Sequence, residues 1–399
     1  MKIAFLVRFF PKLSETFILN QITGLLDLGH DVEIFAEGPS GEAAPPEVRR
    51  RGLDRRTHYF NVPENRGERL GRVPGLLWNA CRTDPALCAR ALNVGRFGAY
   101  SLKLLYAIQP FLGRPFDVLQ CHYGLMGNLG AALKQVGIGR KLVVMFHGAD
   151  IRDGLERGGK LYRPVFRNAD AILAISRYNS ENLLRFGAKP HTVVRHPVGI
   201  DAGLFRERTA DRPTPPSRVV ILTVARLVEV KGVDVGIRAV GILARKRPDL
   251  AVEYRVAGDG PQRDELRALA QRLGLEGTVR FLGAMPHDEV IREMEAADLY
   301  LMPSRAEALP VALMEALCAG LPAVATRVGS ADEVLPDGRA GLLVPPEDAD
   351  ALADELGLLA SQPERWAEMG RCGRRDVMDK YDVRKLNRRL AVIYEDLLR

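Results

Sequence analysis

Apolar residues occur along this chain in short blocks, and longer stretches between the blocks repeat apolar positions at helical spacing. A short apolar block bounded by turn residues is typical of a buried strand, and the longer repeat is typical of an amphipathic helix. Strands that alternate with helices form parallel sheets covered on both faces, so the pattern predicts an α/β fold. Strands are expected at residues 2–7, 31–36, 117–123, 142–146, 171–176, 219–224, 254–258, 279–283, 299–302 and 321–325.

A polar, proline-rich segment near the middle of the chain interrupts this alternation. Residues 206–217 have the composition of a linker. The sequence therefore predicts two doubly wound, Rossmann-like domains, at residues 1–205 and 218–378. Residues 384–397 are amphipathic and predict a final helix, and the glycine-rich stretch at 124–130 predicts a helix packed closely on its sheet.

The stretch at residues 299–320 carries the most chemistry. A buried strand stops at Pro303, a polar loop follows, and a helix is expected to open at Pro310 and to end at Gly320. The start of a helix beyond a parallel strand favours phosphate. Glu307 and Glu315 would repel an anion there unless they bound hydroxyls of the same ligand. The alternative is a surface helix with two solvated glutamates.

The spacing from Glu307 to Glu315, with Leu-Pro inside it, resembles the E-x7-E signature of retaining family 4 glycosyltransferases, which have the GT-B fold. The resemblance implies two Rossmann-like domains that face a central cleft, the first binding an acceptor and the second a nucleotide sugar. It also implies that residues 379–399 cross back to the first domain. Donor contacts on this turn are expected from Ser304, Leu309, Pro310 and Val311.

Two cations stand on the loop after the first strand of the second domain. Arg226 and Lys231 would grip a diphosphate from two directions, the arginine by its planar fork and the lysine as a point charge. The segment resembles the family's G-R-L-x-x-x-K-G element, with Ala225 in place of the first glycine. Two ordinary surface cations are the alternative.

Further elements in the same order also resemble the family. His147 and Asp150 match its H-G-x-D element, which implies a histidine beside the transferred sugar, although a purely structural histidine stays open. Residues 10–17 resemble the opening of family members that build bacterial capsules and exopolysaccharides, so Ser14 and Glu15 join the expected site. Ser14 is equally suited to capping a helix. The resemblance places Gly258, Gly260 and Leu282 beside the nucleotide base.

Charge and cysteine content restrict the partners and the compartment. The net charge is +7, and residues 1–200 hold 28 Lys/Arg against 17 Asp/Glu. This basicity favours an acidic substrate or an anionic membrane over nucleic acid, since no nucleic-acid motif accompanies it. Five cysteines without C-x-x-C spacing indicate a reducing compartment.

Arg8 interrupts the first apolar run, which favours a strand over a signal peptide. No apolar run is long enough to span a bilayer.

The basic, amphipathic residues 76–113 would suit contact with an anionic membrane. We therefore expect a cytoplasmic protein that is peripheral on the inner face of the membrane.

Asp348 and Asp350 mimic a D-x-D metal site, but they stand where acids cap a helix. No metal and no cofactor are therefore expected, apart from a UDP- or GDP-linked donor substrate.

The expected reaction is transfer of a sugar with retained anomeric configuration to a glycan or lipid-linked acceptor in polysaccharide biosynthesis. Glu307 would bind sugar hydroxyls and Glu315 ribose hydroxyls, while Arg226 and Lys231 offset the diphosphate charge. A nucleotide-sugar epimerase of the same architecture and a non-catalytic sugar-nucleotide-binding protein are the alternatives. The sequence does not identify the base, the sugar, the acceptor or the linkage.

Overall fold

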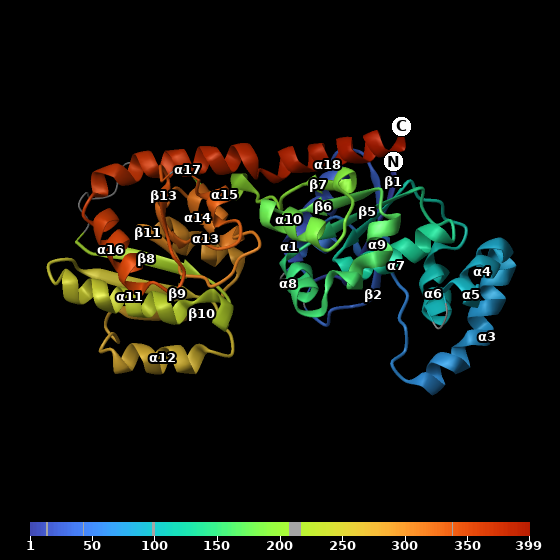
Figure 1. Cartoon of the computed structure of the whole chain (residues 1–399), viewed down its shortest axis with the longest axis horizontal. Coiled ribbons are helices and arrows are strands. Elements are labelled where there is room, and N and C mark those ends of the chain that lie inside the picture. Colours follow the sequence, from blue (N-terminus) through green and yellow to red (C-terminus); the bar gives the residue numbers. More distant parts are fainter. Residues whose placement is uncertain (13–14, 43, 98–99, 207–216, 337) are drawn as a thin grey trace. The chain divides into compact units, whose positions relative to one another are not determined.

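The computed structural model describes residues 1–12, 15–42, 44–97, 100–206, 217–336 and 338–399. Two units divide these residues, one of Met1–Pro197 with Arg384–Arg399 and the other of Val198–Val383 (Figure 1). In this division the last helix, from Arg384, is grouped with residues 1–197. Most of the expected linker, residues 207–216, lies outside the described residues.

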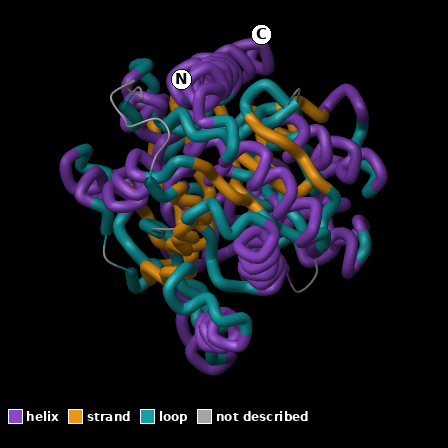
Figure 2. Tube along the Cα trace, turned by 90° about the vertical axis from the view of Figure 1, so that its left-hand side faces the viewer, coloured by secondary structure: helices purple, strands orange, loops and turns teal. Residues whose placement is uncertain are grey.

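The first unit is built on seven parallel strands in the order β3-β2-β1-β4-β5-β6-β7. All residues of β4 and most residues of β5 are buried, as expected for parallel strands covered on both faces. Figure 2 shows strands enclosed by helices. The bounds are β1 (Lys2–Phe9), β2 (Asp31–Gly38), β3 (Thr57–Tyr59), β4 (Val118–His122), β5 (Lys141–Phe146), β6 (Ala171–Ala174) and β7 (Val193–Arg195).

Helices connect these strands, and the expected α/β class is confirmed. Among them, α7 packs very closely on the sheet, because a Cβ at Gly127 would lie 2.6 Å from a methyl of Val144 and one at Gly130 would lie 2.4 Å from the Cys121 sulfur. The helices are α1 (Thr16–Asp27), α2 (Pro46–Arg50), α3 (Arg66–Thr83), α4 (Pro85–Ala91), α5 (Val94–Phe97), α6 (Tyr100–Ile108), α7 (Gly124–Gln135), α8 (Gly148–Arg157), α9 (Arg163–Asn168) and α10 (Arg177–Arg185).

The helices α3 to α6 form an excursion between β3 and β4 (Figure 1). Side-chain caps define where two of them begin. The Asn65 side chain accepts a hydrogen bond from the Gly67 N–H at 2.8 Å, and the Asp84 carboxylate accepts one from the Leu87 N–H at 2.9 Å. Three glycines and Pro74 interrupt helical periodicity in the first half of α3, and its second half falls in the stretch expected to be amphipathic.

The final helix, α18 (Val383–Leu398), confirms the amphipathic pattern seen in the sequence. From Arg384 onwards its residues belong to the first unit. Tyr394 is fully buried, and its hydroxyl donates to Oε1 of Gln120 at 2.7 Å. The Asn387 amide donates to the backbone carbonyl of Asn20 at 3.0 Å.

The second unit has six parallel strands in the order β10-β9-β8-β11-β12-β13. The strands are β8 (Val219–Val224), β9 (Val252–Ala257), β10 (Val279–Gly283), β11 (Leu299–Met302), β12 (Ala323–Thr326) and β13 (Gly341–Val344). The helices are α11 (Val233–Lys246), α12 (Arg263–Arg272), α13 (His287–Ala296), α14 (Val311–Cys318), α15 (Ala331–Val334), α16 (Ala349–Ala360) and α17 (Trp366–Lys380).

In each sheet, successive strands are added first towards one edge and then towards the other, and the two directions meet at one point. The reversal lies between β1 and β4 in the first unit and between β8 and β11 in the second. Loops that leave the carboxyl ends of strands at such a point diverge and leave a crevice, which is where open α/β sheets bind ligands. The fold therefore assigns one candidate crevice to each unit.

The expected helix cap at Asp348 is also confirmed. Its Oδ1 accepts a hydrogen bond from the Ala351 N–H at 2.8 Å, at the start of α16. Asp350 lies in the first turn of the same helix, where its negative charge interacts favourably with the positive end of the helix dipole.

Candidate active site

A cavity of about 210 Å³ lies in the second unit at the reversal between β8 and β11. Its walls are the ends of these two strands, the loop after β11 and the first turn of α14. Among the residues expected from the sequence, it brings together Lys231, Ser304, Glu307, Leu309, Pro310 and Val311. The remaining lining residues are Thr223, Val224, Ala225, Tyr300, Met302, Pro303, Ala312 and Leu313.

The polar centre of this cavity is a three-residue cluster. Lys231 Nζ donates to Glu307 Oε1 at 2.6 Å, and the Ser304 hydroxyl donates to the same oxygen at 2.8 Å. The side chains of Lys231 and Glu307 are 24% and 9% exposed. Partial burial strengthens the attraction between the two charges relative to a solvated pair, so this ion pair is stronger than one on the open surface.

The start of α14 faces this cluster. The helix comprises Val311–Cys318, and Pro310 precedes it as the N-cap residue without a side-chain hydrogen bond to the helix. Gly320 follows with a φ of +82°, so the expected end is confirmed and the start lies one residue beyond Pro310. The first backbone N–H groups of a helix have no partner inside it, which makes this end of the cavity favourable for an anion.

Close backbone packing holds the loops around the cavity together. Gly232 has a φ of +60°, and a Cβ there would lie 2.1 Å from the carbonyl oxygen of Pro303. Gly329 has a φ of +55°, and a Cβ there would lie 1.4 Å from the carbonyl oxygen of Glu307. Both positions require glycine for conformation and for space. The loops after β8 and β12 are thus pressed against the loop that carries Glu307.

Arg305 ties the same loops together by charge, a role that sequence reasoning missed. Its guanidinium forms hydrogen bonds to both carboxylate oxygens of Asp234, at 2.8 and 3.0 Å. It also donates to the Glu229 carbonyl oxygen at 2.7 Å and contacts Glu347. Asp234 lies in the first turn of α11, and the arginine lowers the pKa of its carboxyl group against the effect of burial. No motif in the sequence marks Arg305.

Arg226 is not among the residues that line the cavity. Its side chain is exposed on the loop after β8, and the described residues offer it no hydrogen-bond or ion-pair partner. It shares this loop with Lys231, so a ligand that extends out of the cavity along the loop would meet both cations. The loop therefore carries one partly buried cation, Lys231, and one exposed cation, Arg226.

The residues expected beside the nucleotide base lie at the ends of the next two strands. Gly258 donates its N–H to the Gly283 carbonyl at 2.8 Å, and a Cβ on Gly258 would lie 1.9 Å from the Ala225 carbonyl oxygen. A Cβ on Gly260 would lie 2.5 Å from the Leu227 carbonyl oxygen. Both glycines therefore pack on the β8 loop. Leu282 lies in β10, partly exposed, and none of the three lines the cavity.

Glu315 also lies outside the lining of the cavity. Its side chain is 15% exposed, and its Oε1 accepts a hydrogen bond from Nε2 of His287 at 3.0 Å. This hydrogen bond raises the pKa of His287 above its ordinary value. His287 begins α13, so the pair links α13 to α14. No motif in the sequence marks His287.

In the first unit, His147 lies between β5 and α8 and is almost fully buried. The Asp150 carboxylate accepts hydrogen bonds from the His147 N–H at 2.8 Å and from the Gly124 N–H at 2.9 Å. Asp150 therefore satisfies backbone donors at the starts of both α8 and α7. Burial raises its pKa to about 7. Its carboxylate is engaged inside the protein, as a structural support for His147.

The imidazole of His147 is packed among other rings. Its centroid lies 4.7 Å from that of Phe17 and 4.6 Å from that of Tyr123, and its Nε2 lies 3.2 Å from Nδ1 of His122. Burial lowers the pKa of His147 to about 3 and holds the pKa of His122 well below its ordinary value. Both histidines are therefore neutral near pH 7 and act as hydrogen-bonding groups there.

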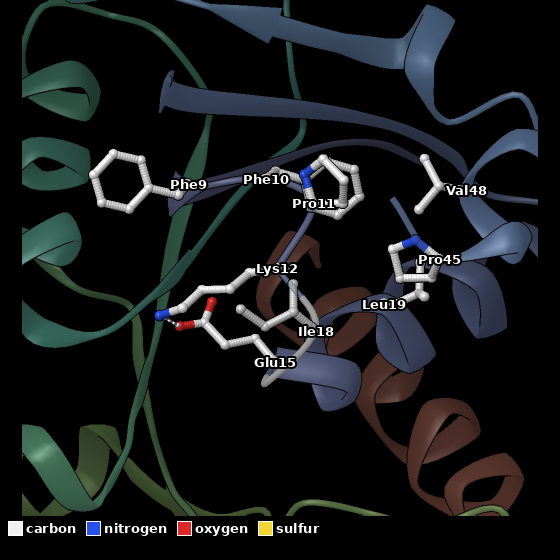
Figure 3. Close-up of a pocket in the computed structure, with 9 residues that line it drawn as sticks. All are labelled: Phe9, Phe10, Pro11, Lys12, Glu15, Ile18, Leu19, Pro45 and Val48. Carbon is white, nitrogen blue, oxygen red and sulfur yellow. Dashed lines mark hydrogen bonds and ion pairs between the residues drawn. The ribbon is translucent and has the colours of Figure 1, made fainter. Parts of the chain in front are cut away.

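Glu15 lines a small, mostly apolar pocket after β1 (Figure 3). Its Oε1 accepts hydrogen bonds from Lys12 at 2.9 Å and from the Tyr123 hydroxyl at 3.1 Å. The pocket is lined by Phe9, Phe10, Pro11, Lys12, Glu15, Ile18, Leu19, Pro45 and Val48. Ser14, the neighbouring expected residue, lies outside the described residues.

The described part of the chain shows no cluster of three or more His, Cys, Asp or Glu side chains arranged to hold a metal ion. Among the described helices, none is long and apolar enough to cross a membrane.

Comparison with known proteins agrees with the expected domain types. Residues 205–376 match the family of glycosyl transferases group 1, and residues 14–199 match the glycosyl transferase 4-like domain. The provisionally named colanic acid biosynthesis glycosyltransferase WcaL of Salmonella typhimurium is 34% identical, and the amylovoran biosynthesis glycosyltransferase AmsK of Erwinia amylovora is 33% identical. Each alignment covers 100% of both chains.

Solved structures agree on the fold. The Anabaena protein HepE, solved in complex with UDP, superposes with a TM-score of 0.74 at 19% identity, covering 99% of this chain and 100% of HepE. A structure of HepE with UDP-glucose gives a TM-score of 0.71. Because two full-length relatives above 30% identity and both domain models point the same way, the chain belongs to the glycosyltransferases with the GT-B fold.

Proposed function

We propose that this protein is a retaining glycosyltransferase of exopolysaccharide biosynthesis that moves a hexosyl group from a nucleotide-diphosphate sugar to an acceptor. The observation that carries the proposal is the cluster of Lys231, Glu307 and Ser304 in front of α14, in the crevice between β8 and β11. A cation, a helix start and a carboxylate together suit a ligand with both phosphates and hydroxyls. The names of WcaL and AmsK support the pathway.

The reaction forms a bond between an acceptor oxygen and the anomeric carbon while the bond from that carbon to the diphosphate oxygen breaks. The acceptor proton passes to the departing diphosphate, so atoms and charge balance. Negative charge that develops on the diphosphate is offset by Lys231, by Arg226 at the outer end of the loop and by the start of α14. With these groups in place the proposal requires no metal ion.

Glu307 serves the sugar in this proposal. When the diphosphate attracts Lys231, the carboxylate is free to accept hydrogen bonds from sugar hydroxyls and to stabilise positive charge on the ring. Glu315, held by His287, binds the ribose hydroxyls. The neutral imidazole of His147 provides a hydrogen-bonding group beside the transferred sugar, and Asp150 fixes its position.

We propose a lipid-linked oligosaccharide as the acceptor, held at the inner face of the cytoplasmic membrane. The excess of 28 Lys/Arg over 17 Asp/Glu in residues 1–200 supports an acidic acceptor such as a lipid diphosphate. We propose a UDP- or GDP-linked sugar as the donor.

A thermal-shift screen of UDP-, GDP- and ADP-sugars tests the proposal. One donor at about 100 times its dissociation constant should stabilise the protein by about 2.7 kcal/mol and raise Tm. Nuclear magnetic resonance of that donor with protein then separates the functions. Transfer to an added acceptor with the same anomeric configuration supports the proposal, and a change of sugar configuration without an acceptor supports an epimerase. No Tm shift with any donor would contradict donor binding.

A further inference from the structure

The two most exposed large hydrophobic side chains among the described residues lie on one helix. Trp78 is 73% exposed and Leu70 is 63% exposed, and both belong to α3. They are two turns apart, with Pro74 midway between them, so the three side chains form a stripe on one face of the helix. Large apolar side chains are seldom left this exposed in pairs on one face without a partner.

Two positions beside this stripe carry no side chain. Gly71 and Gly75 lie next to it, and a Cβ at either position would meet nothing within 4 Å. The opposite face of α3 is anchored, because Ala80 is buried and Val73, Leu76 and Leu77 pack against the core of the first unit. A helix with three glycines and a proline has little intrinsic stability. The exposed apolar side chains of α3 are therefore not there to stabilise the helix itself.

The charge around the stripe is positive. Residues 66–108 hold seven Lys/Arg and two Asp/Glu. Both acids are engaged, Glu68 with Arg72 and Asp84 with the backbone at the start of α4. Arg66 and Arg82 lie one turn beyond Leu70 and Trp78, and neither has an ion-pair partner among the described residues.

We propose that the exposed face of α3 binds an anionic lipid bilayer and lies flat in its headgroup region. Tryptophan and leucine would enter the boundary with the acyl chains, and the two arginines would contact lipid phosphates. The two glycines beside the stripe leave no side chain that would hold the helix away from a broad partner. The contact does not depend on the proposed sugar transfer, so either can fail while the other stands.

The chain has two tryptophans, and only Trp78 is exposed, since Trp366 is 8% exposed. Vesicles of phosphatidylcholine with phosphatidylglycerol should therefore shift tryptophan emission to the blue and protect it from iodide quenching. Replacing Trp366→Phe should leave both effects. Vesicles of phosphatidylcholine alone should give much weaker effects, and added salt should reverse binding.

Co-sedimentation with the same vesicles measures the contribution of each group. The double variant Leu70→Ala with Trp78→Ala should bind at least about tenfold more weakly, and each of Arg66→Glu and Arg82→Glu should weaken binding at least about fivefold. Matched controls are Leu155→Ala on α8, where Leu155 is 56% exposed, and Arg163→Glu with Arg167→Glu on α9. These controls should bind like the wild type, and all variants should keep its Tm.

Two results would overturn the proposal. One is equal binding of the α3 variants and the wild type to anionic vesicles. The other is protection of Trp78 from iodide without vesicles at high protein concentration, because self-association would then cover this face.

Discussion

Lys231 Nζ lies 2.6 Å from Glu307 Oε1, although 76 residues separate them in sequence. The cation proposed for the diphosphate and the acid proposed for the sugar thus form an ion pair with each other. In the proposed function, the phosphates and hydroxyls of the donor become new partners of these two groups. The pair compensates both charges in a partly buried cavity.

The strength of this pair is measurable by a double-mutant cycle. We expect Lys231→Ala and Glu307→Ala each to destabilise the protein, because each leaves an unpaired, partly buried charge. The double variant should be less destabilised than the sum, with a coupling energy of about 1 to 3 kcal/mol. Urea denaturation of the four proteins gives this value. Additive losses would show that the two charges do not interact in solution.

Arg226 should behave differently, because its side chain is exposed and has no hydrogen bond or ion pair with the described residues. Arg226→Ala should keep the wild-type Tm while lowering turnover by about 100-fold, the scale for loss of one charge-stabilising donor. Arg280→Ala, at another exposed arginine of the second unit, is the control. Normal turnover of the Arg226 variant would remove this residue from the site.

Gly329 should be intolerant of any side chain. Gly329→Ala adds a Cβ that would lie 1.4 Å from the Glu307 carbonyl oxygen, so we expect a loss of about 3 kcal/mol or more and weaker donor binding. Gly274→Ala isolates the conformational cost, because Gly274 also has a positive φ, +69°, but nothing within 4 Å of a Cβ. That control should lose about 1 kcal/mol. Equal losses would show that the loops do not meet at Gly329.

The pair of His287 and Glu315 predicts a pH dependence. The hydrogen bond with Glu315 raises the pKa of His287, with a smaller contribution from Asp288, and burial opposes it. Because the folded pKa is the higher one, stabilisation by the pair is complete below about 6.5 and is lost as pH rises through the folded value. Proton resonances of the His287 ring should show this raised pKa, and Glu315→Gln should lower it towards 6.5. An unchanged titration would contradict the pairing.

Local patterns were sufficient to predict much of the second unit. The apolar block at β11, the break at Pro303 and the glycine at 320 each reflect a short-range preference, so the strand and α14 appeared nearly within their observed bounds. Six expected site residues line one cavity for the same reason, since they lie on one strand-to-helix turn and on the loop beside it.

Long-range pairings could not be predicted this way. Nothing near Glu315 in sequence indicates His287, and nothing near Arg305 indicates Asp234, because these contacts arise only when separate loops meet. The expected role of Asp150 in binding the donor is still a proposal, but its carboxylate is engaged by two backbone N–H groups. The first half of helix α3 was hidden because its glycines and proline obscure helical periodicity, whereas its second half lies in the stretch expected to be amphipathic.

The central claim is that Lys231 grips the diphosphate of a sugar nucleotide. Isothermal titration calorimetry of UDP and GDP against the wild type and Lys231→Ala tests it most directly, with Lys246→Ala on α11 as a control for loss of an exposed lysine. We predict that Lys231→Ala binds the preferred nucleotide at least about tenfold more weakly, the scale of a lost charge-assisted hydrogen bond, and that Lys246→Ala binds normally. Equal affinity of the wild type and Lys231→Ala for that nucleotide would contradict the account.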